Sequence, residues 1–590
     1  MQIIPLGDSA LIVRVRDRFD DAPEETLDTV LRAFQQLRGA NIPGVIELAP
    51  AYTSVAVFFD PVAVARATET PDKMFEWLAT RIRGVVAAGA ERGRHRSGAS
   101  PVVRLLKIPV CYDREFALDI DDVARCAKTS PSEVVRLHSA AEYRVACIGF
   151  VPGFPFLTGL PKELATPRRE VPRKEIPLGS VGIGGAQTGI YPLRSPGGWN
   201  LIGRTPLRLF DSQKNPPALL RAGDRVRFRK ITRDEFEVVI HEPSSRAQSR
   251  VPVAIPSVGH GDSSTSVGMT ATTQRAGFVT SVQDLGRTGF REFGVSSGGA
   301  LNSFGLRVAN LLVGNHEGAA GLEITLGGLQ LRFEDERIVA WCGGEFDVSI
   351  GSTQLPPGHA GHVQAGERLK FGRPQIGCRA WLAVSGGIDV PAVLGSQSTD
   401  LRAQFGGFGG RTLRDGDELH LGTRPGSSPP ATGISTWTAP HDWVSPAMPK
   451  PILRFVRGVD WDRFNTSTLR RLTTEAFTVS PDSDRMGVRL EGPELKRTDE
   501  SDLISEAVAP GTIQVPPNGK PILLLGDCQT IGGYPKIAHV ITVDLGIAAQ
   551  LRAGDHVRFS EVALTDAHRL LLEREREFER FRIGLSLQHT

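Results

Sequence analysis

The sequence predicts a mainly β protein with several domains and a small α/β domain at its N-terminus. Its 590 residues are too many for a single hydrophobic core. Glycine and proline occur 64 and 41 times and are spread along the chain without a fixed period, which is typical of many short strands joined by turns. A turn-and-strand pattern that recurs along the chain favours the same fold class.

Residues 1–92 carry signals of both strands and helices. Leu11–Val13 and Val55–Phe59 are short apolar runs, which predict strands. Apolar residues from Phe75 to Val86 recur at helical spacing and predict a helix. This region is therefore expected to fold as the α/β domain.

Composition predicts the remaining boundaries. Two tracts rich in Ser, Thr, Gly and Pro have the character of linkers between domains. The charged tail has apolar residues spaced as in an amphipathic helix that docks on the rest of the protein. The predicted segments are a β-barrel at 101–242, a linker at 243–273, β domains at 274–422 and 446–562 with a linker at 423–445 between them, and the tail helix at 563–590.

Internal repetition predicts that one β-barrel unit recurs. Ala222–Phe228 matches Ala553–Phe559, and each is a Gly-Asp turn followed by an alternating strand. Weaker copies start at Ala365 and Asp415, so that 274–422 is expected to be a diverged third copy. A second repeated element pairs two segments, Gln187–Pro192 and Gln529–Pro535.

Charge and composition exclude several classes of function. The 69 basic and 66 acidic side chains give a net charge of +3, which offers no reason to expect nucleic acid or a membrane surface as partner. No run reaches the length of a membrane helix, and we expect a cytoplasmic protein whose six cysteines are buried free thiols. The sequence contains no phosphate-binding loop of the Walker type and no biotin-accepting Met-Lys-Met, and we predict no metal site.

The first candidate site follows the apolar run 522–525. Asp527 is placed to act as a base, whereas Gln529 and Thr530 are expected to hold an amide or urea-like group. Lys536 is expected to neutralise an oxyanion, and Tyr534 adds a phenol to the same segment. The alternative is a polar loop whose side chains satisfy its own backbone.

A second candidate site combines Arg287 with Ser296, Gly298 and Gly299. A Ser-Gly-Gly sequence at the start of a helix leaves N–H groups that suit a phosphate or carboxylate, and Arg287 would add a bidentate contact. The alternative is a capped helix with glycines for close packing. We expect this segment and the Asp527–Lys536 segment to surround one cleft for a small planar amide.

Two further segments are candidates for substrate binding. Asp484 and Arg485 lie in a turn that is suited to orienting a small polar molecule, although a salt-bridged turn has the same pattern. Gln187 and Tyr191 lie among Gly-, Pro- and aromatic-rich segments that are suited to walling a pocket, or equally to forming rigid turns around a barrel.

Taken together, these motifs resemble the 5-oxoprolinase family. The N-terminal part resembles the B subunit, also described as allophanate hydrolase subunit 1, and is similar to a sporulation histidine-kinase inhibitor. The C-terminal part resembles the C subunit, or allophanate hydrolase subunit 2. The matching segments are 149–155, 167–168, 171–173, 179–185, 187–192, 195–199 and 201–206 in the N-terminal part, and 280–287, 294–300, 310–315, 322–328, 384–391, 479–492, 505–516 and 527–537 in the C-terminal part.

The resemblance implies a natural fusion of two subunits with cyclophilin-like β-barrels. It also implies ancestry shared with the carboxyltransferase domain of urea carboxylase. The implied activity is the ATP-dependent opening of 5-oxoproline to glutamate. It would require a partner subunit of the LamB/YcsF type, and the two proteins would share the binding of ATP and Mg²⁺. The chain is also a candidate homo-oligomer. The alternatives are carboxyl transfer from carboxybiotin on a separate carrier, and inhibition of a histidine kinase. Asn302 and Ile531 stand where the family usually has Asp and Thr.

Overall fold

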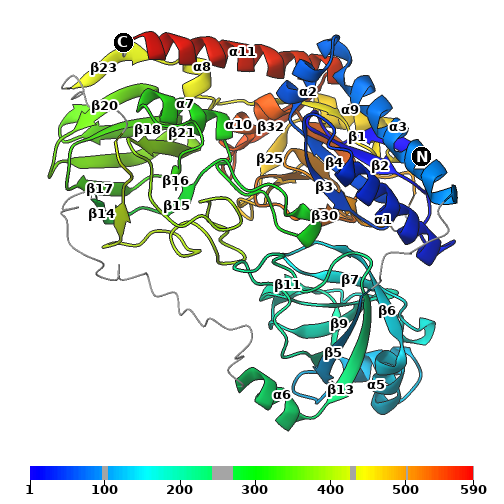
Figure 1. The fold of residues 1–590 in the computed structure, drawn as a ribbon. Coiled ribbons are helices and arrows are strands. Elements are labelled where there is room, and N and C mark those ends of the chain that lie inside the picture. Colours follow the sequence, from blue (N-terminus) through cyan, green and yellow to red (C-terminus); the bar gives the residue numbers. More distant parts are fainter. Residues whose placement is uncertain (96–103, 242–269, 425–432, 500–502, 589–590) are drawn as a thin grey trace.

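The computed structural model describes residues 1–95, 104–241, 270–424, 433–499 and 503–588. Strands predominate, and two of the β domains close into barrels, so the predicted fold class is confirmed. Figure 1 shows the N-terminal domain in blue, the first barrel in cyan, a large sheet in green and the second barrel in orange. Most of the predicted linker at 243–273 lies outside the described residues.

The N-terminal domain contains an antiparallel sheet in the order β1-β2-β4-β3. Leu11 and Val57 point into a core shared with the helices, whereas Ile12 and Phe58 pack against the second barrel. Successive side chains of a strand point to opposite faces, so burial of both faces explains why these runs are continuously apolar. The elements are β1 (Gln2–Pro5), β2 (Ala10–Arg14), α1 (Pro23–Gly39), β3 (Val45–Pro50), β4 (Ser54–Phe59), α2 (Pro61–Ala67) and α3 (Met74–His95).

The first barrel closes in the order β10-β7-β6-β13-β5-β12-β9, with β5 and β13 parallel. Val226 and Phe228 alternate into its core, which α4 and α5 also cover. The elements are β5 (Leu105–Cys111), α4 (Ile120–Cys126), α5 (Pro131–Ala140), β6 (Glu142–Ile148), β7 (Pro155–Thr158), β8 (Arg173–Ile176), β9 (Ser180–Gly184), β10 (Gln187–Ile190), β11 (Ser195–Gly197), β12 (Asn200–Arg204), β13 (Arg225–Ile231) and α6 (Arg233–His241).

The second barrel closes in the order β24-β31-β28-β29-β26-β25-β32, with β24 and β32 parallel. This is the circuit of the first barrel, with β24 in the place of β5 and β32 in the place of β13. The elements are β24 (Ile452–Arg457), α9 (Thr466–Thr474), β25 (Phe477–Val479), β26 (Gly487–Glu491), β27 (Glu506–Ala507), β28 (Thr512–Gln514), β29 (Ile522–Leu524), β30 (Ile531–Gly532), β31 (Lys536–Val540), α10 (Leu545–Ala548) and β32 (His556–Glu561).

The shared circuit separates a true repeat from an accidental one. Ala222–Phe228 leads into β13 and Ala553–Phe559 leads into β32, which are equivalent strands. The prediction for the second element is wrong, because Gln187–Pro192 supplies β10 of the barrel wall, whereas Gln529–Pro535 supplies β30, which pairs with β27 outside the barrel. The segment around Asp527 is therefore not a copy of the segment around Gln187.

The predicted third copy is an open sheet in the order β22-β14-β17-β21-β18-β20-β23, to which β15 and β16 add through β21. The linker prediction at 423–445 is wrong for β23, which pairs with β20, and for α8. The elements are β14 (Thr270–Ala276), β15 (Val279–Gln283), α7 (Ser303–Leu312), β16 (Gly321–Thr325), β17 (Leu329–Phe333), β18 (Arg337–Ile350), β19 (Thr353–Gln354), β20 (His359–Val363), β21 (Arg368–Val384), β22 (Glu418–His420), β23 (Ile434–Thr438) and α8 (His441–Val444).

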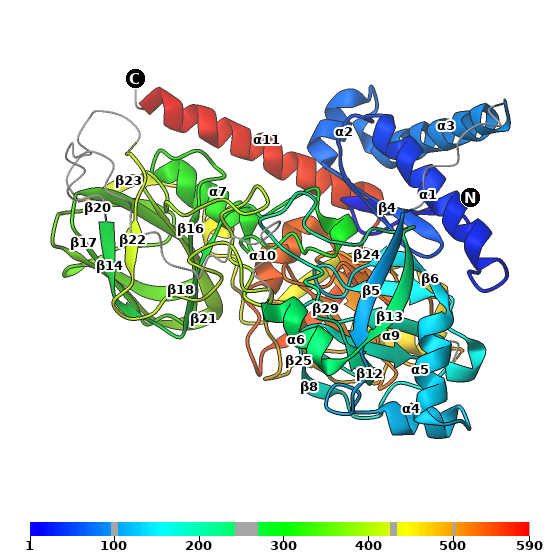
Figure 2. The same cartoon turned by 60° about the horizontal axis from the view of Figure 1, so that its bottom comes forward.

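The predicted tail helix is α11 (Leu564–Gln588), which lies along one side of the molecule in Figures 1 and 2. Leu572 joins the core of the N-terminal domain. Farther along, Phe578 packs against Phe304 and Trp443, with ring centroids 5.5 and 6.4 Å away. The helix therefore ties the N-terminal domain to the open sheet.

Two observations bear on location. No helix among the described residues is long and apolar enough to cross a membrane. The six cysteines are free, as predicted. Five of them are buried, but Cys126 is exposed, so the prediction that all six are buried is wrong for this residue.

We predict that Phe578→Ala lowers the free energy of unfolding by about 3–5 kcal/mol, because it leaves a cavity beside Phe304 and Trp443. Chemical denaturation followed by tryptophan fluorescence measures the change. Ile583→Ala on the same helix is the matched control, since Ile583 is 51% exposed and should cost little. Equal losses in the two variants would contradict the docking role of α11.

Candidate active site

A small cleft lies where the first barrel, the open sheet and the second barrel meet. Phe150 and Pro152 come from the β6–β7 connection, and Gly294 and Ser296 precede α7. The other lining residues lie on the β21–β22 connection and after β29, namely Asp400, Arg402, Asp527, Cys528 and Gln529. The structure thus brings the Ser296 and Asp527 segments together, as the sequence predicts.

Asp527 is held by a buried arginine. The Nε of Arg485 donates to Asp527 Oδ2 over 2.8 Å, and Nη2 donates to Oδ1 over 3.2 Å. Nη2 also donates to the carbonyl of Gly299 over 2.8 Å, and Nη1 donates to Glu323. Asp484, beside this arginine, does not line the cleft, and its Oδ1 accepts from the backbone N–H of Met486 over 2.8 Å.

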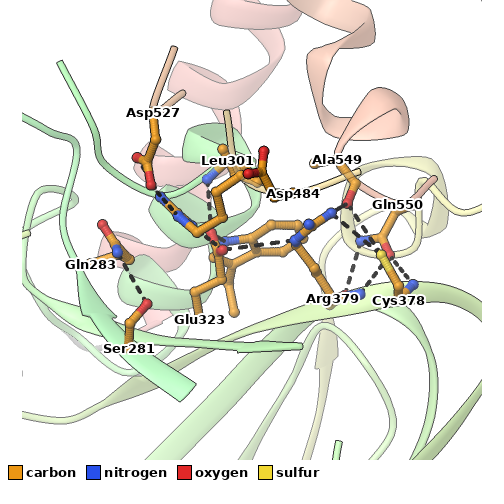
Figure 3. Close-up of polar contacts among 12 residues, drawn as sticks. Ser281, Gln283, Leu301, Glu323, Cys378, Arg379, Asp484, Asp527, Ala549 and Gln550 are labelled. Carbon is orange, nitrogen blue, oxygen red and sulfur yellow. Dashed lines mark hydrogen bonds and ion pairs between the residues drawn. The ribbon is translucent and has the colours of Figure 1, made fainter. Parts of the chain in front are cut away.

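Glu323 is the second carboxylate of this cluster and extends from β16. It accepts from the backbone N–H of Leu301 and from Trp381 Nε1, each over 2.9 Å. Figure 3 shows Glu323 between Leu301 and Arg379, with Asp527 nearby. The cluster therefore joins the open sheet to the second barrel below the cleft.

The two carboxylates differ as acids. Burial raises the pKa of Asp527, and the nearby Arg485 offsets this only in part. Burial also works to raise the pKa of Glu323, but Arg485 and Arg379 together hold it below its ordinary value. Asp527 is therefore the carboxylate that takes a proton more readily, and it is also the one that lines the cleft.

The expected helix start at Ser296–Gly299 is wrong. Helix α7 begins at Ser303, and Asn302 caps it by accepting from the N–H of Gly305 over 3.0 Å. Gly298 and Gly299 instead lie in a tight loop with left-handed φ values of 59° and 86°. The anion site at a helix N-terminus is thus absent here, and Asn302 keeps the capping role that an aspartate would have.

Arg287 lies directly behind this loop and is 2% exposed. Its Nη2 donates to the carbonyl of Ser398 over 2.5 Å, and its guanidinium lies 4.8 Å from the ring centroid of Phe405. Nε and Nη1 have no hydrogen-bond partner among the described residues. A Cβ atom on Gly298 would lie 3.1 Å from Nη1 and 4.0 Å from Asp527 Oδ1, so the free nitrogen and this carboxylate both lie beside Gly298.

Asp400 and Arg402 also line the cleft, although no motif in the sequence marks them. Asp400 Oδ1 accepts from the backbone N–H groups of Arg402 and Ala403 over 3.1 and 2.8 Å. Arg402 Nη1 donates to the carbonyl of Phe150 over 3.4 Å, and its guanidinium lies 5.0 Å from that ring's centroid. In the sequence they stand out only as one acidic and one basic residue just before a glycine-rich segment.

Lys536 does not line the cleft. The side chain is buried, with Nζ 3.5 Å from Glu506 Oε2 and 3.9 Å from Asp460 Oδ2. Arg14 of the N-terminal domain also donates to Glu506, over 3.0 and 2.9 Å. Lys536 therefore neutralises carboxylates at a domain interface, and the structure gives no support to its expected role toward an oxyanion.

The other predicted residues differ in their placement. Gln529 lines the cleft, and its Nε2 donates to Gln514 Oε1 over 3.3 Å. The remaining four are not lining residues: Thr530 is buried, Tyr534 is 43% exposed, Gln187 lies on β10 and Tyr191 packs in an aromatic cluster of the first barrel.

Apolar contact joins the first barrel to the segment after Asp527. Ile531 belongs to the same cluster as Phe154 and Trp199. A Cβ atom on Gly149 would lie only 2.8 Å from the side chain of Ile531, so the two segments are in close contact. The departure from the usual threonine therefore fills an interface.

The N-terminal domain also holds the loop of the cleft. Glu47 accepts from the backbone N–H groups of Phe290 and Arg291 over 2.7 and 2.8 Å, and pairs with the Arg291 guanidinium at 3.0 Å. Arg291 Nη2 then donates to Ser297 Oγ over 3.1 Å. Glu47 is therefore positioned to fix the loop that carries Ser296.

Comparison with known proteins identifies the family. The model described as "Carboxyltransferase domain, subdomain C and D" matches residues 1–220, and "Carboxyltransferase domain, subdomain A and B" matches residues 293–561. The C subunit of the 5-oxoprolinase of Escherichia coli (strain K12) is 41% identical over 305 residues, which are 52% of this chain and 95% of that protein. This chain belongs to the carboxyltransferase-domain family.

Other members of the carboxyltransferase-domain family match each half or both. The B subunit of the 5-oxoprolinase of Bacillus subtilis (strain 168) is 42% identical over 242 residues, 41% of this chain and 97% of that protein. The crystal structure of TTHA0988 has a TM-score of 0.74 and 31% identity and covers 93% of this chain and 99% of that one. The urea amidolyase of Lachancea kluyveri is 31% identical over 316 residues, but they make up only 17% of that protein. The predicted resemblance to fused 5-oxoprolinase subunits is confirmed.

We predict that Arg485→Met lowers the free energy of unfolding by about 3–5 kcal/mol at neutral pH, because it leaves the buried Asp527 without its cation and Glu323 with Arg379 alone. The loss should shrink as the pH falls, since protonation of Glu323 and Asp527 then removes the uncompensated charges. Denaturant unfolding at several pH values measures both effects.

Arg489→Met is the control for Arg485→Met, since Arg489 is exposed and lies in the same segment. Glu323→Gln combined with Arg485→Met should recover part of the stability. An Arg485→Met loss that is small and independent of pH would show that the cluster does not hold the structure together.

Proposed function

We propose that this protein is the component of an ATP-dependent 5-oxoprolinase that opens the lactam of 5-oxoproline to give glutamate. The observation that carries the proposal is that the two halves of the chain line one cleft. The N-terminal half contributes Phe150 and Pro152, and the C-terminal half contributes Ser296 and Asp527. The relatives that match these halves are the B and C subunits of 5-oxoprolinases, and their names support the same activity.

The reaction has to activate an unstrained amide. Transfer of the γ-phosphoryl group of ATP to the amide oxygen makes the ring carbon electrophilic. A first water then adds to this carbon and the C–N bond breaks, which leaves an acyl phosphate and a free amine. A second water hydrolyses the acyl phosphate to glutamate and phosphate. Asp527 takes the proton of the attacking water, because it is the carboxylate with the raised pKa in the cleft. Gln529, on the same wall, hydrogen-bonds the lactam.

The nucleotide belongs to a shared site. In the part of the chain that the structure describes, no three His, Cys, Asp or Glu side chains are arranged to hold a metal ion. We assign ATP and Mg²⁺ to an interface with a cytoplasmic partner subunit of the LamB/YcsF type, and no residue of this chain is assigned to the metal.

Carboxyl transfer is the second candidate. The description of the family models and the similarity to urea amidolyase favour it. In that reaction carboxybiotin on a separate carrier would donate a carboxyl group to urea or another amide in the same cleft. The chain spans only part of urea amidolyase, so the carrier and the ATP-dependent module would come from other chains.

The deciding experiment combines the purified chain, the partner subunit, ATP and 5-oxoproline, and measures glutamate and ADP. We predict glutamate formation that needs every component, and a loss of at least about 100-fold in kcat for Asp527→Asn. Asp482→Asn, an exposed aspartate on a neighbouring turn, should keep full activity. Carboxylation of urea without any release of glutamate would favour the second candidate.

The pH profile tests the role of Asp527. Only the ionised carboxylate accepts a proton, so kcat/KM should fall as the pH drops through a pKa above the ordinary value of 3.8. Glu323→Gln removes a negative charge near Asp527, and Arg485 then pairs with Asp527 alone. Both changes lower the pKa of Asp527, so the acidic limb of the profile should move to lower pH. If the acidic limb of the pH profile does not move in Glu323→Gln, that limb reports the titration of a group other than Asp527.

A further inference from the structure

Arg402 presents a cation to the cleft that the protein itself does not neutralise. Its polar contacts are the carbonyl of Phe150 at 3.4 Å and the sulfur of Met486 at 3.7 Å. Among the described residues, no carboxylate oxygen lies within ion-pair distance of it. Asp400 and Asp484 are near enough to act on its charge, but each has an oxygen engaged by backbone N–H groups of its own turn.

The charge is also costly where it lies. Arg402 is partly buried against the ring of Phe150, and burial without a partner disfavours the charged form. Arg287, behind the loop, is a second guanidinium without a carboxylate partner, and its free Nη1 lies beside Gly298, as Asp527 does. A cation without a counter-ion in a cleft, with a second one close behind it, is typical of a site for an anionic ligand.

We propose that Arg402 binds the carboxylate of the substrate, so that the cleft selects a small amide that carries a carboxylate over a neutral one. This inference rests on the proposed function, since 5-oxoproline bears such a group and urea does not. Arginine pairs with carboxylates through two parallel N–H···O bonds, which fix orientation as well as position. A carboxylate held at Arg402 directs the lactam toward Asp527 and Gln529, which line the same cleft.

Both halves of the chain contribute to this subsite. Arg402 comes from the β21–β22 connection of the C-terminal half, whereas the carbonyl and ring that orient it belong to Phe150 of the N-terminal half. The selectivity for a carboxylate therefore depends on contact between the halves and not on either one by itself.

The test compares Arg402→Met and Arg402→Lys in the full chain assembled with its partner subunit and ATP. The substrates are 5-oxoproline and 2-pyrrolidinone, which is the same lactam without a carboxylate. We expect Arg402→Met to raise KM for 5-oxoproline by about 10- to 100-fold, to leave kcat/KM for 2-pyrrolidinone unchanged, and Arg402→Lys to recover part of the loss. Arg414→Met, an exposed arginine on the same connection, is the control.

An unchanged KM for 5-oxoproline, or an equal loss with both lactams, would overturn the subsite. If the wild-type assembly releases no glutamate, the proposed function fails and binding decides the subsite on its own. Calorimetric titration of the full chain with 5-oxoproline then supports it if Arg402→Met, but not Arg414→Met, weakens binding at least about 10-fold. Absence of binding by the wild-type chain, or equal binding by Arg402→Met, would overturn it.

Discussion

The position of the cleft depends on the guanidinium of Arg485, which lies between two buried carboxylates. One of them, Asp527, follows a strand of the second barrel, and the other, Glu323, belongs to the open sheet. Burying three charges costs free energy that apolar packing would not, so the cluster is better explained by position than by stability. It holds the sheet and the barrel in one arrangement and leaves Asp527 as the more basic carboxylate.

The N-terminal half closes the site from the other side. Its α/β domain packs on both barrels. Leu27 and Tyr52 join an apolar cluster of the first barrel, where Arg144 also pairs with α1. The second barrel is held by apolar contacts, the Arg14–Glu506 ion pair and the contact of Asp8 with Thr542. Its barrel supplies Phe150, and Glu47 holds the loop before α7. A chain that joins both halves thus encodes the cleft in a single polypeptide.

Prediction from the sequence succeeded where the signal is local. The Gly-Asp turn before β13 and β32 predicted equivalent strands, and the density of polar groups after β29 located the segment that carries Asp527 and Gln529. It failed for Lys536, because the two carboxylates that engage it are 30 and 76 residues away in the chain. Arg402 was missed because neither a repeat nor a family motif singled it out.

By itself, the sequence determined the β-rich class, the repeated barrel, the family and the two segments that meet at the cleft. Periodicity and turn chemistry act over a few residues, so they can be recognised without a fold. Only the tertiary structure decided which charges are neutralised inside the protein and which remain for a ligand. That outcome depends on distances between residues far apart in the chain. The charge of Lys536 is paired with carboxylates inside the protein, whereas the charge of Arg402 is not.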